Sequence, residues 1–318
     1  MDTVMITGGT GMIGRAVSKA LLEAGFRVII LTRDHRVNDP VKTIQQQDEP
    51  AIVPALQYAG WNIEKGEIDR EALAQADAII HLAGAGIAEK RWTHKRKKEI
   101  LDSRIKSGEL LVNALSNYEN KVRVVVSASA IGWYGPDPVI PNPNPFTEEM
   151  PAFNDFMGQT CKKWEASLDP VLSLGKRLVK LRTGFVLAKD GGAIREFDRP
   201  LMFGLATILG SGRQVISWIH IDDLVRLYIA AMKDAVFSGS YNAVGPAPVS
   251  NKELILQLGK RRKGRFFIPF YVPSFILKMV YGELMTEVLK SVTVSNRKVK
   301  DAGFIFQYPS ITTALENC

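Results

Sequence analysis

The N terminus carries the feature that most constrains the fold, a short apolar stretch that runs directly into a glycine-rich turn. Residues 3–7 have the composition of a strand, and Gly8, Gly11 and Gly14 follow at a spacing of three before a helix that begins near Ile13. Glycine permits a tight turn, close approach of a ligand to the backbone and close packing of helix on strand. Because a helix N terminus also offers unpaired amide donors, the arrangement predicts a site for the pyrophosphate of a dinucleotide. A purely structural glycine turn is the alternative.

Strand-like and helical segments alternate through the first half of the chain. Further strands are expected at 27–31, 78–82, 123–127 and 178–182. Helices are expected to begin near Arg70, Lys95 and Asp155. This alternation predicts an α/β fold, a Rossmann-type doubly wound parallel sheet with a smaller C-terminal substrate lobe.

The predicted domains each combine two stretches of the chain. Residues 1–186 with 213–244 are assigned to the dinucleotide-binding domain, and residues 187–212 with 245–318 to the substrate lobe. The cleft between the two is expected to hold the substrate. A proline-rich stretch, 136–151, predicts a long loop over that cleft.

Composition excludes several classes of protein. The 318 residues are 46% hydrophobic, enough for a large core, and Cys161 and Cys318 are too few for a disulfide framework or a zinc site. The polar stretch 34–59 is expected on the surface, without chemistry. With no leader-like segment before the first strand, the expected location is the cytoplasm, and no metal is expected.

The longest apolar run, residues 266–280, is interrupted by Pro269, Pro273 and Lys278. It is shorter than the roughly 20 residues that a membrane crossing needs. The prediction is therefore a buried helix of the second lobe and no membrane contact.

Positive charge, +8 overall, concentrates at residues 90–98 and 260–265. Such clusters can bind nucleic acid, but no helix-turn-helix, RNA-binding signature or aromatic platform accompanies them. Solvated surfaces are the favoured interpretation, a basic rim that steers an anionic ligand is a second, and no nucleic acid is expected.

The residue after the second predicted strand indicates which dinucleotide binds. A site selective for NAD usually places Asp or Glu there, whereas this chain has Arg33. A guanidinium can pair with a 2′-phosphate, so NADP is predicted over NAD, with a plain surface arginine as the alternative. Trp61 and Asn62 occupy the place where a third strand would face the adenine, although Trp61 can equally be core.

Three further segments carry a family resemblance: HLAG at 81–84, SASAIGWYG at 127–135 and WIHIDD at 218–223. Together with TGGTGMIG at 7–14 they resemble the extended short-chain dehydrogenase/reductase superfamily, which contains nucleotide-sugar epimerases and dehydratases. RTGFVL at 182–187 is similar to one atypical epimerase-like branch, sometimes labelled as cell division inhibitors.

The resemblance extends over nearly the whole chain and implies a larger cofactor site. Besides the three glycines and Arg33, that site would include Thr10, Met12, Ile13, Leu82, Ala83, Gly84 and Val186.

The superfamily's catalytic pair, a tyrosine and a lysine in YxxxK, is absent here. If Glu165 closes the same helix motif, Met157 takes the place of the tyrosine and Cys161 that of the lysine. The accompanying serine is retained as Ser129, with Ser127 less favoured, and Arg104 stands where the usual asparagine would be. A thioether cannot transfer a proton, so the usual mechanism does not carry over.

Two residues are candidates to replace the tyrosine. Cys161 would lie near the nicotinamide and could act as acid or nucleophile, or be a small buried hydrophobe. Tyr134 offers a phenol in the same region, or simply closes the cleft wall. His220 is expected to have a packing role.

Substrate recognition is assigned to four residues besides Arg104. Arg91 and Trp92 offer a cation and a stacking face, Asn154 precedes the motif helix, and Arg213 is the only cation near the place of the superfamily's sugar-nucleotide arginine. Surface charge is the alternative, and a nucleoside-diphosphate sugar is not secured as substrate.

The leading functional hypothesis is an NADP-dependent oxidoreductase or isomerase, such as an epimerase, acting on a small polar carbonyl or sugar-like substrate. Ser129 would hydrogen-bond the carbonyl oxygen and Arg104 would stabilise developing negative charge. The alternative is a non-catalytic NADP-binding sensor or scaffold protein. A homodimer through the helices of Arg104 and Lys162 is an expectation from the superfamily.

Overall fold

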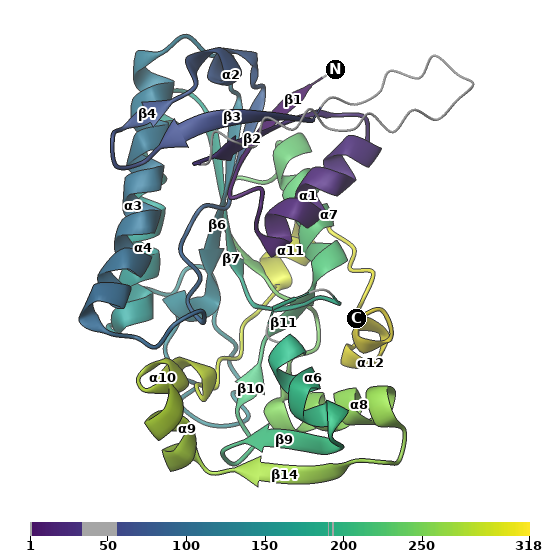
Figure 1. The fold of residues 1–318 in the computed structure, drawn as a ribbon. Helices are drawn as coiled ribbons and strands as arrows, with labels where there is room; N and C mark the ends of the chain where they lie inside the picture. Colours follow the sequence, from purple (N-terminus) through teal and green to yellow (C-terminus); the bar gives the residue numbers. More distant parts are fainter. Residues whose placement is uncertain (1, 34–55, 190, 193) are drawn as a thin grey trace.

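A computed structural model describes residues 2–33, 56–189, 191–192 and 194–318 (Figure 1). Residues 34–55, most of the stretch predicted as a polar surface excursion, lie outside the described residues. The prediction of an exposed stretch is wrong for residues 56–59, because Leu56 begins a strand in which Ala59 is buried. Hydrogen bonding to the neighbouring strand outweighs the polar composition there.

An eight-stranded sheet forms the centre of the molecule and confirms the predicted doubly wound α/β fold. Its strands run in the order β12-β7-β6-β5-β1-β2-β3-β4 and are parallel except for β4, which is antiparallel to β3. Strand order reverses at β1, and ligands of such sheets bind at the carboxyl ends of the strands beside that reversal. The bounds are β1 (Thr3–Thr7), β2 (Arg27–Thr32), β3 (Leu56–Asn62), β4 (Glu67–Ile68), β5 (Ala78–His81), β6 (Val124–Ala130), β7 (Arg177–Thr183) and β12 (Gly239–Ala243).

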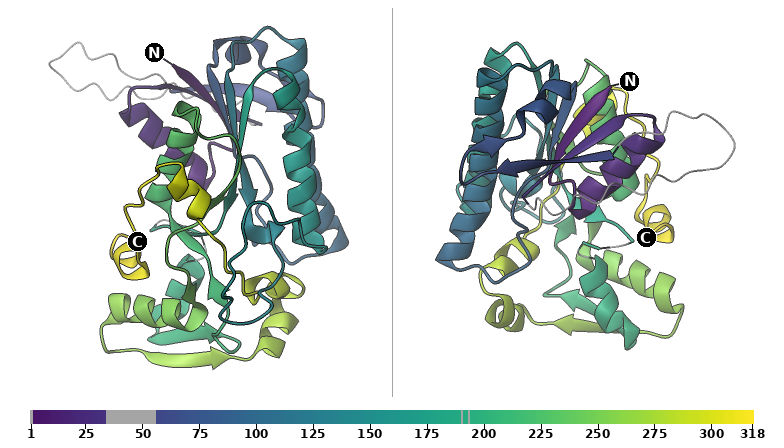
Figure 2. Two further views of the ribbon diagram at one scale, coloured as in Figure 1. Left: turned by 180° about the vertical axis from the view of Figure 1, so that it is seen from behind. Right: turned by 45° about the horizontal axis from the view of Figure 1, so that its top comes forward.

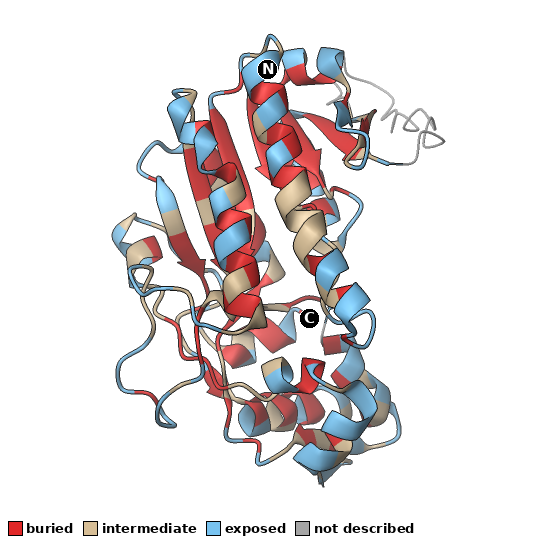
Figure 3. Cartoon of the chain, turned by 90° about the vertical axis from the view of Figure 1, so that its left-hand side faces the viewer, coloured by how far each residue is buried: buried red, intermediate tan, exposed pale blue. Residues whose placement is uncertain are grey.

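Helices cover both faces of the sheet (Figures 1 and 2). One face packs against α1 (Met12–Glu23) and α7 (Ile221–Lys233), and α11 (Arg297–Asp301) lies beside β12. The other face packs against α3 (His94–Asn117) and α4 (Phe156–Leu168), whose inward sides are buried (Figure 3). The short helices on that face are α2 (Arg70–Gln75) and α5 (Pro170–Ser173).

A third apolar cluster forms the core of the second lobe. The helices around it are α6 (Ile194–Met202), α8 (Asn251–Lys263) and α12 (Ile311–Glu316). The short strands pair in twos: β8 (Phe185–Leu187) with β11 (Trp218–His220), β10 (Val215–Ile216) with β13 (Val249–Ser250), and β9 (Leu205–Leu209) with β14 (Ile268–Val272). The remaining elements are the 3-10 turn η1 (Ile131–Trp133) and helices α9 (Ser274–Tyr281) and α10 (Leu284–Val288).

The prediction of a buried helix at 266–280 is wrong. The segment forms β14 and α9, in which Leu277 alone is buried. Prolines 269 and 273 forbid one continuous helix, and β14 finds a single partner strand, β9, so most of its side chains stay exposed. Among the described residues, no helix combines the length and apolar character needed to cross a membrane.

Candidate functional site

The glycine turn after β1 has the close packing that the sequence predicts. Gly8 adopts φ +69°, and its carbonyl accepts a hydrogen bond from the Gly11 amide at 3.0 Å. A Cβ at Gly14 would lie 2.3 Å from the Gly8 oxygen and 2.6 Å from the Gly9 Cα, so a larger residue cannot fit at position 14 without opening the turn. Helix α1 therefore begins directly against the end of β1.

The N terminus of α1 keeps its amide donors available. Gly11 is the N-cap residue, so no side chain caps the helix, and the first turn contains no acidic residue. The first hydrogen bond of the helix runs from Arg15 to the Gly11 carbonyl, which leaves the amides of Met12, Ile13 and Gly14 without helical partners. Thr10 and Gly11 are exposed. These donors and the helix dipole fit a pyrophosphate.

Arg33 is exposed and directly follows β2, the neighbour of β1. Asn62 accepts hydrogen bonds from the Glu64 and Lys65 amides at 3.1 Å and thereby holds the turn after β3. Trp61 is buried in the core beside Ile68. Of the three residues predicted to contact the adenosine, Arg33, Trp61 and Asn62, only Arg33 is exposed.

The wall beside the turn depends on residues that the sequence analysis did not single out as functional. The Thr7 hydroxyl accepts hydrogen bonds from the Leu82 and Ala83 amides at 3.1 and 3.2 Å and lies 2.8 Å from His81 Nδ1. The other ring nitrogen of His81 lies 3.3 Å from the Ser107 hydroxyl. Burial lowers the pKa of His81 to about 3, so the ring is neutral. The sequence offered one signal for this wall: a polar residue lies at or near the end of each of the predicted strands 3–7 and 78–82.

Met12 and the segment after Val186 converge on the other side of the turn. A Cβ at Gly192 would lie 3.4 Å from the Met12 sulfur and 3.6 Å from the Val186 carbonyl oxygen. Ile13 and Val186 are half-buried against the core beneath the sheet. The structure thus brings these predicted cofactor residues to one end of β1.

The position of the superfamily's tyrosine is filled by a buried thioether. Met157 packs with Trp92, Ile100 and Leu284 in a small apolar cluster. A Cβ at Gly132 would lie 3.2 Å from the Met157 Cβ, so the chain after β6 approaches α4 closely. No group at this position can donate or accept a proton.

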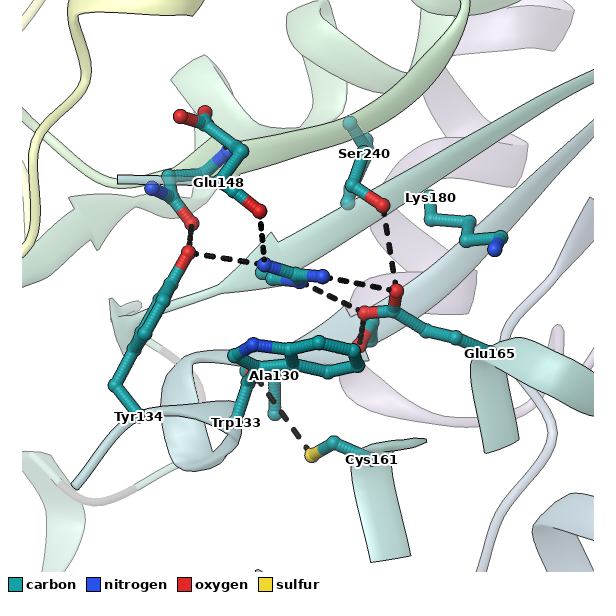
Figure 4. Close-up of polar contacts among 12 residues, drawn as sticks. Ala130, Trp133, Tyr134, Glu148, Cys161, Glu165, Lys180 and Ser240 are labelled. Carbon is teal, nitrogen blue, oxygen red and sulfur yellow. Dashed lines mark hydrogen bonds and ion pairs between the residues drawn. The ribbon is translucent and has the colours of Figure 1, made fainter. Parts of the chain in front are cut away.

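Ser129 lies in a buried network with Glu165 and Arg182 (Figure 4). Its hydroxyl donates to Glu165 Oε1 at 2.7 Å, and Arg182 Nε donates to the same oxygen at 2.8 Å. Arg182 Nη2 donates to Glu165 Oε2 at 3.1 Å, which makes the pair bidentate, and the guanidinium lies 3.6 Å from the centre of the Trp133 ring. The hydroxyl proton of the retained serine is therefore used in a hydrogen bond within the protein.

Tyr134 and Cys161, the two predicted proton donors, are both buried beside this network (Figure 4). The Tyr134 hydroxyl donates to Asn242 Oδ1 at 2.7 Å and accepts from Arg182 Nη1 at 3.1 Å. Cys161 Sγ lies 3.7 Å from the Ala130 carbonyl oxygen. Burial raises the pKa of Tyr134 and of Cys161 to about 12, so both stay protonated at neutral pH.

Arg104 reaches the same region from α3. Its Nη1 donates to the Ala85 and Ile100 carbonyls at 3.0 Å, and its guanidinium lies 4.9 Å from the centre of the Trp164 ring. A Cβ at Gly84 would lie 3.2 Å from its Cζ. Burial lowers the pKa of Arg104, although the group remains a cation at neutral pH. In the described part of the chain, no carboxylate forms an ion pair with it.

The predicted substrate residues lie in different settings. Trp92 is buried, donates from Nε1 to the Ile87 carbonyl at 2.8 Å and packs edge-to-face on Phe156. Arg91 is exposed, and its guanidinium lies over Gly282 at the end of α9. The two other residues, Asn154 before α4 and Arg213 before β10, are exposed. No metal-binding cluster of His, Cys, Asp or Glu occurs among the described residues.

Comparison with known proteins places this geometry in a family. Residues 4–156 match the NAD dependent epimerase/dehydratase family, and residues 272–318 match a domain of unknown function. An epimerase family protein of Staphylococcus saprophyticus is 33% identical over 318 residues, which cover 100% of this chain and 99% of that relative. The chain belongs to this epimerase family.

Other members of the family extend the comparison. The Arabidopsis thaliana protein named epimerase family protein SDR39U1 homolog, chloroplastic, is 34% identical over 98% of this chain and 85% of its own. The crystal structure of human epimerase family protein SDR39U1 with NADPH matches with a TM-score of 0.82 and 28% identity, over 99% of this chain and 98% of that one. The atypical epimerase-like family resembled by the sequence is thereby confirmed, with its Rossmann fold.

Proposed function

We propose that this epimerase family member binds NADP and acts as an oxidoreductase or isomerase on a small polar carbonyl or sugar-like substrate. The proposal rests on one observation: the N terminus of α1 has no capping side chain and packs closely against the glycine turn through Gly14, and Arg33 directly follows the adjacent strand β2. The NADPH in the structure of the human relative supports the same cofactor here.

Each part of the site has a defined task under this proposal. The amides of Met12 and Ile13 bind the pyrophosphate, and Arg33 pairs with the 2′-phosphate. Thr7 and neutral His81 hold the backbone at Leu82 and Ala83 against the dinucleotide. A dinucleotide held by these residues would supply hydride-transfer chemistry at the substrate end of the site.

The substrate end uses cationic stabilisation more than proton transfer. Arg104, half-buried and without a carboxylate partner in the described chain, is placed to stabilise negative charge on a carbonyl oxygen. The Ser129 hydroxyl already donates to Glu165, so it can accept a hydrogen bond but has no second proton to donate. The Tyr134 hydroxyl already donates to Asn242, and burial raises the pKa of Tyr134 and of Cys161 to about 12, so both are weak acids and water supplies the proton that completes a reduction.

A second candidate, a non-catalytic NADP sensor or scaffold, is favoured by one observation. Met157 fills the tyrosine position with an apolar group, and its neighbours pack it closely. In that case dinucleotide binding would change the affinity for a partner without any transfer of hydride.

A single-turnover experiment distinguishes the two candidates. The protein is loaded with one equivalent of NADPH deuterated at C4 and offered a panel of small carbonyl compounds and sugar nucleotides. The proposal predicts transfer of deuterium to at least one compound, detected by mass spectrometry, and no transfer from the Gly14→Ala variant. Tight binding of NADPH without transfer to any compound, together with no isomerisation of any sugar nucleotide by the protein loaded with NADP⁺, would favour the sensor.

A further inference from the structure

One end of the second lobe exposes many large apolar side chains. They come from the end of α6, the start of β9, β14 and α9, which together form the edge of the molecule drawn lowest in Figure 1. Phe203, Phe266 and Phe275 are 83, 87 and 71% exposed. We call this set the distal strip; its residues are Met202, Phe203, Leu205, Phe266, Ile268, Phe270, Tyr271, Phe275, Met279, Val280 and Tyr281.

The packing of β14 explains why the strip stays uncovered. β14 pairs with β9 in a two-stranded sheet, and no described strand pairs with its other edge. Side chains on both faces of β14 are exposed, including Ile268, Phe270 and Tyr271. Exposed apolar patches of this kind usually mark an interaction surface.

The chain from the end of α8 to the end of α9 carries positive charge only. Residues 260–281 contain six cations and no acidic residue. Arg262 is paired with Asp198 of α6, whereas Lys260, Arg265 and Lys278 are exposed. The segment thus combines aromatic side chains with unneutralised positive charge.

We propose that the distal strip docks on a membrane surface that carries anionic phospholipids. Aromatic and aliphatic side chains enter the boundary between headgroups and acyl chains, while Lys and Arg beside them bind the headgroup phosphates. A second copy of the chain fits less well, because a twofold contact across the strip would enclose two copies of the exposed cations Lys260, Arg265 and Lys278 in one interface. The expectation of no membrane contact rested on the run 266–280 being too short for a crossing, which does not exclude a surface contact, and on its burial, which the structure contradicts.

Vesicle flotation tests this inference with the full-length protein. Vesicles of phosphatidylcholine alone are compared with vesicles that contain about 30% phosphatidylglycerol. The wild type should float with the anionic vesicles and not with the neutral ones. Raising NaCl from about 0.1 to about 0.5 M should release most of it, because the headgroup contacts are screened.

Variants with matched controls locate the contact. Phe266→Ser with Phe275→Ser should weaken binding to anionic vesicles by about tenfold. Ile305→Ser, which changes an apolar side chain that is 78% exposed outside the strip, should bind as the wild type does. Lys260→Glu with Arg265→Glu should weaken binding by at least about thirtyfold, whereas Lys90→Glu with Lys95→Glu, in the other basic cluster, should have little effect.

Three results would overturn the inference. One is no flotation of the wild type, and another is equal flotation of the strip variants. The third is a concentration-dependent dimer in light scattering that the phenylalanine variants dissociate, without flotation, which would assign the strip to a second copy. Unchanged thermal unfolding of the variants, expected at exposed positions, keeps loss of flotation distinct from loss of fold.

Discussion

The two ends of the candidate site differ in how their polar groups are satisfied. At the glycine turn, the amides at the start of α1 have no partner within the helix or from a capping side chain, and the residues around them are exposed. Between β6, α4 and β7 the polar groups instead bond one another: Ser129 with Glu165, Glu165 with Arg182, and Arg182 with Tyr134. The features that bind a dinucleotide are therefore kept, whereas those that transfer a proton in the superfamily are replaced by a structural network.

Removal of Arg182 should produce the largest change in stability. Arg182→Met leaves the Glu165 carboxylate buried without its partner, and we expect the free energy of unfolding to fall by about 3–5 kcal/mol. Urea unfolding measures this. Arg199→Met, which breaks an exposed pair with Glu196, is the control and should cost less than about 1 kcal/mol. Equal stability of Arg182→Met and wild type would contradict the structural role of the network.

Gly14→Ala should damage the opposite end of the site. The added Cβ, 2.3 Å from the Gly8 oxygen, forces the turn to open, and we expect NADPH affinity to fall by about 100-fold in calorimetric titration. Gly25→Ala adds a methyl group where no atom lies within 4 Å but where φ is +83°, so it strains the backbone away from the site. That control should lose some stability and keep NADPH affinity; equal losses of affinity would mean that global destabilisation, not the turn, is measured.

Acid should weaken the wall that Thr7 and His81 support. Burial lowers the pKa of His81 from 6.5 to about 3, so below pH 6.5 the unfolded chain binds a proton that the folded chain does not. This group's share of the free energy of unfolding is therefore intact at pH 7 and lost as the pH falls, by about 2 kcal/mol at pH 5. His81→Gln should remove that part of the pH dependence in urea unfolding, and His94→Gln, at an exposed position, should not. The same slope in all three proteins would contradict a buried neutral His81.

The sequence predicted the nucleotide-binding part well because its signals are local. Strand, glycine turn and helix follow one another within Thr3–Glu23, and alternation of strand-like and helical segments sufficed for the sheet. The motif alignment also predicted that Met157 and Cys161 replace the catalytic pair, and both lie on α4 as expected.

The remaining features depend on contacts between distant segments. Ser129, Glu165 and Arg182 lie far apart in the chain, and no spacing shows that Arg182 holds Tyr134 as well as Glu165. The segment 266–280 was predicted to be buried from its hydrophobicity alone. Hydrophobicity does not say whether any other element is available to cover a segment, and around β14 no described element does.

Arg33→Ala has the smallest expected effect, and it shows whether NADP, and not only a dinucleotide, binds at this turn. Calorimetric titration of the wild type and the variant with NADPH and with NADH isolates the contribution of the 2′-phosphate to the binding affinity. We expect the variant to lose about tenfold in NADPH affinity and to keep its NADH affinity, because a single charge-assisted pair is removed. Equal loss for both dinucleotides, or no loss for either, would contradict it.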